Sequence, residues 1–463
     1  MLGGLGLARR VNLQFEGWWL VFLPAVLLLK KRNIISLYLV IALGLSIGLA
    51  RGGVYMQHVH QLQSLALQKV TIVATAASDS IYGNNSQVQF TGNDIEMPQP
   101  YKSQLAGTFK LSGFGEKMIY RGDRVQVTGK LYPSRGSNQA TIAYAQLSRL
   151  SEGHSVFDDL SRRFSAGMQS ALPEPMASFG LGLLVGQRNT LPADITAALT
   201  AVGLVHIVAV SGYNLTIIVR GVGRLKLGSR YQKLAVSLGL ILAFVLITGF
   251  SASIIRAALV SVLSLWAWYY GRQIKPMLLI SFAAAVTAMW NPFYVWGDLS
   301  WYLSFLAFFG ILVIGPIIQA RLFRRAPRML TAVLLETLSA ELMTLPLIMM
   351  TFSQLSVVSL AANILVVPLV PLAMLLSAVA AGAGMLIPQF AGWFALPARL
   401  LLTYMLDIVH LLADIPSALT RVGLNPEMMV IAYVVIAVLV ITLRRRPKVQ
   451  IDSTKTELEA ITP

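Results

Sequence analysis

The chain has 463 residues, of which 56% are hydrophobic and only 12% charged, and its formal net charge at pH 7 is +17. Apolar runs recur along most of its length, which excludes an ordinary soluble protein and indicates an integral membrane protein. The chain has no cysteine, so disulfides, thiolate metal sites and a cysteine nucleophile are excluded. Cytoplasmic loops collect Lys and Arg because these residues set membrane orientation, and a nucleic-acid partner is the alternative explanation of the charge.

Residues 1–51 predict an N-terminal transmembrane hairpin. Apolar runs at 15–29 and 33–50 flank a Lys-Lys-Arg turn at 30–32, which indicates a cytoplasmic loop. Because the first run ends in basic residues and not in a small-residue cleavage site, we expect it to remain as a span.

Residues 52–153 predict an extracellular β domain, because apolar and polar residues alternate there between Gly-rich turns. About five short strands in so few residues fit a small closed barrel, and the run at 120–129 resembles a strand of an OB-fold. An OB-fold would bind single-stranded nucleic acid through aromatic rings and cations. The aromatic candidates, which could equally be core residues, are Phe109, Phe114, Tyr120 and Tyr132.

Residues 154–196 predict an amphipathic interfacial helix, 155–172, followed by a short apolar piece, 176–186. A transmembrane domain, 197–443, and a polar cytoplasmic tail, 444–463, come next. With the first two runs, nine further apolar runs make about eleven expected spans, since each is near the length that crosses a bilayer. The nine are 197–219, 231–249, 252–270, 276–290, 299–319, 329–352, 357–387, 391–413 and 427–443.

The loops of this domain are alternately rich in Lys and Arg and free of them, which places the β domain outside and the C-terminus in the cytoplasm. Two runs leave alternatives open. The run at 357–387 contains Pro368 and Pro371, so it is either a broken span or a re-entrant hairpin. The run at 391–413 carries a polar stripe that either lines the bundle or lies in the membrane plane. This stripe consists of Arg399, Thr403, Asp407 and His410.

The sequence GLVHIVAVSGYNLT at 203–216 interrupts an apolar run with polar groups. His206 is followed by Ser211 and Gly212, a pair that weakens helix, and then by Asn214. Irregular backbone and polar groups at membrane depth are tolerated only inside the protein or along a wet cavity, so this segment predicts the inside of a bundle. Ser211 and His206 could form a catalytic pair, but a helix would place them about 140° apart, and there is no G-x-S-x-G motif.

Other polar residues lie within or next to the expected spans, where each charge costs roughly 2.5 to 3.5 kcal/mol and needs a partner or a cavity. They are Arg256, Asp298, Glu336, Glu341 and Asn363. We predict that Arg256 and His206 line a water-filled path for an anionic polymer, with the carboxylates as structural supports. The alternative is a buried Arg and Glu pair that only sets helix register. Asn363 would satisfy backbone groups freed by a helix break or join two helices.

Several motifs resemble the ComEC family of bacterial competence channels. They are GLLVGQR at 182–188, GLVHIVAVSG at 203–212, TGFS at 248–251 with Arg256, and FSQLS at 352–356 followed by Asn363 and Pro368. The resemblance implies an inner-membrane channel for uptake of single-stranded DNA during natural transformation. It supports His206, Ser211, Gly212, Asn214, Arg256 and Asn363 as candidates for the DNA path. Where the family usually has Leu-His after Ser-Gly, this chain has Tyr213-Asn214.

The resemblance also implies an external DNA receptor and a cytoplasmic helicase-like ATPase as partners. The sequence has no G-x-x-x-x-G-K-[ST] loop, which agrees with an ATPase on another chain. Many family members carry a metallo-β-lactamase-like domain, but this sequence has no H-x-H-x-D-H motif, so we expect a channel without cofactor or enzyme activity and a separate nuclease. The alternative functions are an intramembrane hydrolase using Ser211 and His206, and a secondary transporter of a small anion.

Overall fold

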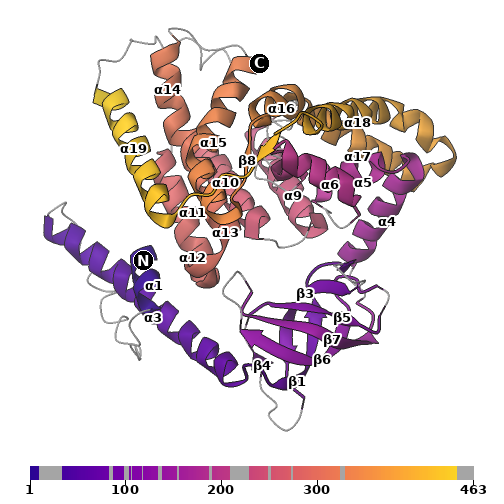
Figure 1. The fold of residues 1–463 in the computed structure, drawn as a ribbon, viewed down its shortest axis with the longest axis horizontal. Helices are drawn as coiled ribbons and strands as arrows, with labels where there is room; N and C mark the ends of the chain where they lie inside the picture. The colour runs from indigo at the N-terminus through magenta and orange to yellow at the C-terminus, as the bar shows by residue number, and fades with distance from the viewer. Residues whose placement is uncertain are drawn as a thin grey trace. The chain divides into compact units, whose positions relative to one another are not determined.

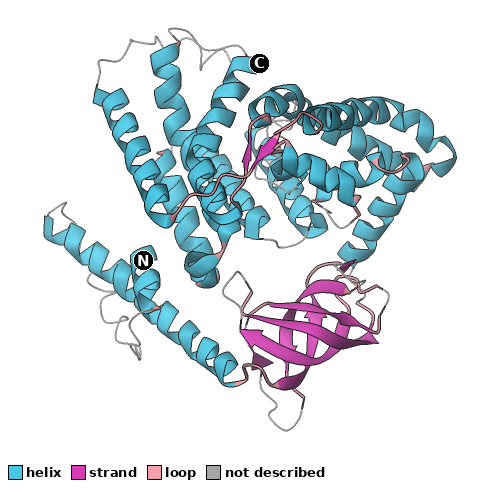
Figure 2. Ribbon diagram, in the orientation of Figure 1, coloured by secondary structure: helices cyan, strands magenta, loops and turns pink. Residues whose placement is uncertain are grey.

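The computed structural model forms two compact units. It describes residues 1–9, 34–82, 87–98, 104–105, 107–116, 118–133, 138–153, 156–186, 190–208, 229–248, 252–272, 275–323 and 329–445. Unit 1 comprises Met1–Arg162, Leu242–Leu259 and Ser281–Tyr302, and unit 2 comprises Arg163–Ile241, Val260–Ile280 and Leu303–Pro463. Most described residues are helical, and the strands are concentrated in one domain of unit 1 (Figure 1, Figure 2).

The β domain predicted from the alternating pattern is confirmed. Its seven-stranded sheet has the order β1-β6-β7-β5-β3-β2, with β4 paired to β3. The strands are β1 (Lys69–Ala76), β2 (Ile81–Tyr82), β3 (Val88–Glu96), β4 (Gln104–Leu105), β5 (Phe109–Phe114), β6 (Arg124–Pro133) and β7 (Ala140–Ser151). Alternate side chains such as Val70, Ile72 and Ala74 are buried in the core, as the period of a half-buried strand requires.

The predicted closed barrel needs correction. Two of the seven strands, β2 and β4, are only two residues long. Strand β1 pairs with β6 over seven residue pairs but with β3 over only three, with a register shift between Val73 and Thr75. Asp94 in β3 has a left-handed φ of 47° at this irregular pairing. The observed domain is therefore a twisted sheet with one short, irregular pairing at the position where a barrel would close.

Unit 1 also contains two closely packed N-terminal helices, α1 (Leu2–Ala8) and α3 (Ile34–Ser64), and the latter runs well past the expected span at 33–50. Small residues every fourth position allow their backbones to touch. A Cβ at Gly48 would lie 2.2 Å from the Met1 carbonyl oxygen, and one at Gly52 would lie 2.4 Å from the Ala8 Cβ. The predicted span at 15–29 lies outside the described residues.

Helix α3 is joined to the β domain and to helix α12 (Phe293–Gly297), all within unit 1. Gln139 Nε2 donates a hydrogen bond of 2.5 Å to the Tyr55 hydroxyl, and the Tyr55 ring contacts Phe293 and Trp296 edge-on. Trp296 Nε1 donates to the Leu5 carbonyl at 2.9 Å. These contacts hold α3, at Tyr55, against Gln139 of the β domain and against α12.

The remaining helical elements follow in chain order. They are α4 (Val156–Ala171), α5 (Met176–Val185), α6 (Ala193–Ala201), α7 (Val205–Val208), α9 (Arg230–Thr248), α10 (Ala252–Tyr269), α11 (Pro276–Trp290), α13 (Leu299–Phe309), the π-helix η3 (Gly310–Ile314), α14 (Gly315–Leu322), α15 (Met329–Phe352), α16 (Ser359–Val366), the 3-10 helix η4 (Val367–Leu369), α17 (Val370–Leu386), the 3-10 helix η5 (Pro388–Phe390), α18 (Ala391–Ala413) and α19 (Pro426–Arg445). Helices α4, α9, α10, α11 and α13 contain residues of both units.

Five helical stretches among the described residues are long and apolar enough to cross a membrane. They are Leu299–Leu322, Leu334–Phe352, Ser359–Leu386, Pro388–Ala413 and Pro426–Leu443. These stretches agree with a polytopic membrane protein, and the total of eleven spans stays a prediction.

The core of unit 2 is formed mainly by α5, α17 and α18. The predicted helix at 155–172 is present as α4, and its apolar side packs into this core through Met168. Gly167 lies so close to α17 that a Cβ there would be 2.6 Å from the Ala381 carbonyl oxygen. On α18, Arg399, Asp407 and His410 are exposed and Thr403 is half-buried, so most of this stripe lies outside the core of unit 2.

Two of the expected spans are interrupted, as their sequences predicted. The run at 197–219 breaks at Gly203, which has a φ of +75° between α6 and α7, earlier than the predicted break at Ser211. The run at 357–387 changes to a 3-10 turn, η4, which contains Pro368 and separates α16 from α17. This helix break agrees with the broken-span alternative, and how the run crosses the membrane stays a prediction.

The motif FSQLS forms a feature that the sequence did not predict. Leu355–Ser356 is a short strand, β8, that pairs antiparallel with β9 (Leu419–Thr420) in unit 2. This pairing holds the start of α16 next to the loop between α18 and α19.

Candidate functional site

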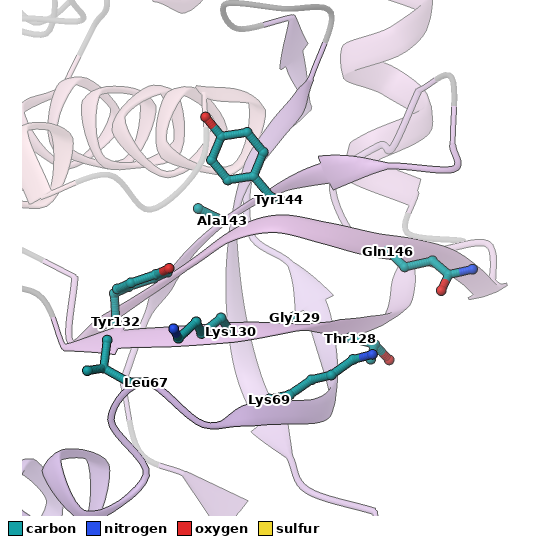
Figure 3. A pocket seen from close by; sticks show the side chains of 9 residues that line it. All are labelled: Leu67, Lys69, Thr128, Gly129, Lys130, Tyr132, Ala143, Tyr144 and Gln146. Atoms are coloured by element: carbon teal, nitrogen blue, oxygen red, sulfur yellow. The ribbon is translucent and has the colours of Figure 1, made fainter.

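Side chains from β1, β6 and β7 line an open groove of about 560 Å³ on the β domain (Figure 3). The groove residues are Leu67, Lys69, Thr128, Gly129, Lys130, Tyr132, Ala143, Tyr144 and Gln146. Lys69 and Lys130 are exposed and stand directly opposite each other in the antiparallel β1–β6 pair. Like charges in this position destabilise a sheet, and a bound anion would relieve the repulsion.

A β-bulge shapes this groove. Lys130 pairs with Ala143 and Thr128 with Gln146, so Gly129 alone faces Tyr144 and Ala145. A Cβ at Gly129 would lie 2.6 Å from the Ile142 Cγ2, which explains the glycine. Tyr144 has a φ of 53° and is 72% exposed, whereas a regular strand would turn it to the buried side with Ile142. Backbone strain of this kind occurs at functional sites.

The four aromatic candidates of the β domain have different environments. Phe109 is fully buried and belongs to the core, while Phe114 is exposed away from the groove. Tyr120 lies under the Arg162 guanidinium, 4.7 Å from the ring centroid, as a cation–π pair. Of the four, only Tyr132 lines the groove. Tyr144, the most exposed aromatic groove residue, was missed because no local pattern in the sequence reveals the bulge.

In unit 1, Arg256 is fully buried on α10. Its Nη2 donates to the Ser300 carbonyl at 3.1 Å, and Asp298 lies close enough to attract the guanidinium electrostatically. Asp298 also caps α13, because its Oδ1 accepts from the Ser300 amide at 2.9 Å. The alternative partners considered for Arg256, Glu336 and Glu341, belong to unit 2. The acidic residue that balances Arg256 is thus Asp298.

In unit 2, polar residues from separate segments meet in a second cluster. Asn363 Nδ2 on α16 donates to Glu341 Oε1 on α15 at 2.9 Å, and the Ser359 side chain also hydrogen-bonds this carboxylate. Gly203 packs against Ser356 and Ser359, and a Cβ at Gly203 would be 2.9 Å from the Ser359 Cβ. Gly203, the first residue of the motif at 203–212, therefore lies beside Ser356 of the motif at 352–356.

The other predicted site residues are placed as follows. His206 is exposed on α7, with Nδ1 3.0 Å from the Gly203 carbonyl oxygen. Ser211, Gly212 and Asn214 lie outside the described residues. Glu336 is half-buried on α15. Within the described part of the chain, no group of three or more His, Asp or Glu side chains could hold a metal ion.

A family model described as "Competence protein" matches residues 183–447, more than half of the chain. The chain belongs to this family. This confirms the resemblance inferred from the motifs. ComE operon protein 3 of Bacillus subtilis (strain 168) is 26% identical over 310 residues, which cover 61% of this chain and 39% of that protein. No solved structure matches.

The competence region at 183–447 includes both helical clusters, the one around Arg256 and the one around Glu341. The groove of the β domain lies before it in the chain. The matched region therefore contains the helical clusters and does not contain the groove.

Proposed function

We propose that this chain takes part in DNA uptake for natural transformation, as an inner-membrane channel that passes a single strand. The observation that carries the proposal is membership of the competence protein family over residues 183–447. The five long apolar stretches supply helices from which a membrane channel can be built. Because the match covers 39% of ComE operon protein 3, the activity of that whole protein is transferred here only as a proposal.

We propose that the β domain is OB-like and gathers DNA outside the cytoplasmic membrane, with the C-terminus in the cytoplasm. In support, β1 pairs with β6 on one side and, over three residue pairs, with β3 on the other, which is compatible with the partly open barrel of an OB-fold. Strand β5 runs parallel to β7. Exposed cations beside exposed tyrosines are the combination that holds single strands, since phosphates are neutralised and bases stack on the rings. Lys69, Lys130, Tyr132 and Tyr144 provide this combination in the groove.

The proposed DNA path within the helices uses His206, Ser211, Gly212, Asn214, Arg256 and Asn363. Asp298 holds Arg256, and Glu341 holds Asn363, so these carboxylates act as structural supports in the path. Translocation would depend on an external DNA receptor and a cytoplasmic helicase-like ATPase, with a separate nuclease for the second strand. The chain itself is proposed to act without enzyme activity.

Transformation with fluorescently labelled DNA tests the channel in a strain that lacks this gene. We expect the label to stay outside the cytoplasm in the deletion strain and to enter again when the wild-type gene is restored. His206→Ala should insert into the membrane at the wild-type level, because the side chain is exposed. It should fail to restore uptake, because His206 belongs to the proposed DNA path. Normal entry of label in the deletion strain would exclude the channel function.

A further inference from the structure

The cluster around Glu341 has the composition of a ligand site. A carboxylate and three neutral polar side chains meet there inside apolar helices, and we name Glu341, Ser356, Ser359 and Asn363 the 341/363 cluster. Asn363 and Ser359 both hydrogen-bond the carboxylate. Ser356 is the neighbour of Ser359 at Gly203, where a Cβ would lie 3.6 Å from Ser356 Oγ and 2.9 Å from Ser359 Cβ.

Two oxygen atoms of the cluster lack a partner. Asn363 is 1% exposed, and its Oδ1 is buried with no hydrogen-bond donor among the described residues. The same holds for Ser356 Oγ in the described part of the chain. Oδ1 belongs to the same amide group as the Nδ2 that donates to Glu341. A buried acceptor without a partner costs about 1–3 kcal/mol, so a ligand that reached both atoms would offset this cost.

The charge of the cluster is also uncompensated. Within the described residues, Glu341 has no Lys, Arg or His within ion-pair distance. A carboxylate among apolar helices needs a partner of opposite charge or a wet cavity. A cation with oxygen ligands would satisfy the carboxylate and both unfilled acceptors together.

We propose that the 341/363 cluster binds one dehydrated monovalent cation, for which sodium is the probe. Carboxylate, amide and hydroxyl oxygens are ligands of hard cations. A single carboxylate balances one positive charge, whereas a divalent ion would leave a net charge buried among apolar side chains. Glu341 is only half-buried, which leaves the ion a route into the cluster.

Binding of radioactive sodium to the purified full chain in lipid nanodiscs tests the site. The wild-type chain should bind about one sodium ion, displaceable by unlabelled sodium chloride but not by choline chloride. Glu341→Gln should weaken binding at least about tenfold, since the only charged ligand is lost, and Ser356→Ala should weaken it less. Glu336→Gln is the matched control, because Glu336 lies on the same helix outside the cluster and should bind sodium like the wild type.

Circular dichroism and gel filtration establish that each variant is folded, and Ser356→Ala tests the site even where Glu341→Gln does not fold. Sodium retained equally by the wild type, Glu341→Gln and Ser356→Ala would overturn the proposal. A folded wild-type chain that binds no sodium would also overturn it. The assay contains no DNA, so its result does not depend on the proposed channel function.

Discussion

Lys69 and Lys130 project from the surface of the β domain, whereas Arg256 is fully buried among helices of the same unit. The two lysines face each other without an acidic partner in the groove, while Arg256 has the Ser300 carbonyl and the charge of Asp298. An exposed cation needs no protein partner, because water solvates it and it remains available to a ligand. A buried cation must be balanced by the fold.

This difference separates binding from stability. Residues of the groove should contribute to affinity for an anionic strand and little to folding. Arg256 and Asn363 should contribute to folding first, so a loss of transformation in their variants has to be distinguished from a loss of structure. Four experiments test this distinction, from the largest expected effect to the smallest.

Arg256→Ala should lower the free energy of unfolding by about 3–5 kcal/mol, because it leaves Asp298 buried without its cation. Thermal unfolding in detergent measures the loss. Arg256→Lys should not restore stability, since an ammonium group does not reproduce the planar guanidinium. In a double-mutant cycle, Asp298→Asn should cost less in the Arg256→Ala background than in the wild type. Additive losses would contradict the electrostatic link between the two residues.

Asn363→Leu should lower the free energy of unfolding by about 1–3 kcal/mol in sodium-free buffer, because the half-buried Glu341 carboxylate loses a hydrogen-bond donor. Thermal unfolding again provides the measurement. The control is Leu365→Ala, an exposed position on the same helix, which should change the unfolding midpoint less. Equal effects of the two substitutions would mean that the bond between Asn363 and Glu341 adds nothing to stability.

Tyr132→Ala and Tyr144→Ala should each weaken binding of a fluorescent oligothymidine to the full chain by about 1–3 kcal/mol, the usual contribution of one stacked base. Fluorescence anisotropy measures the affinity, and Tyr144→Phe should keep it because the ring remains. Phe114→Ala is the control, since Phe114 is exposed on the same domain outside the groove. An equal loss of affinity in Phe114→Ala would remove the groove as the binding face.

Replacing both Lys69 and Lys130 by Ala should have the smallest effect on the fold, with an unfolding free energy within about 0.5 kcal/mol of the wild type. The salt dependence of oligothymidine binding should become shallower by about 1.4 in log–log slope, or about 0.7 for each lost phosphate contact. Arg124→Ala is the control, because Arg124 is paired with Glu96 at 2.8 Å and does not line the groove. An unchanged slope in the double variant would show that the two lysines contact no phosphate.

Local patterns in the sequence predicted the helices and strands better than they predicted the contacts between them. The alternation at 70–73 predicted a strand, and β1 covers it because one side of that strand faces the core. The apolar runs at 231–249 and 276–290 are helices α9 and α11 with nearly the same ends. In contrast, the strand β8 is only two residues long and pairs with a segment more than sixty residues away, so no local period marks it.

The sequence by itself determined that the chain is rich in membrane-length apolar helices, carries a β domain and belongs with competence proteins. Hydrophobic period, run length and motif order can be recognised in the sequence without knowledge of packing. Only the tertiary structure decided that Asp298 balances Arg256, that Asn363 meets Glu341, and that a bulge turns Tyr144 outward. Each of these depends on contacts between separate helices or strands, whose crossing and register are set by packing across the whole unit.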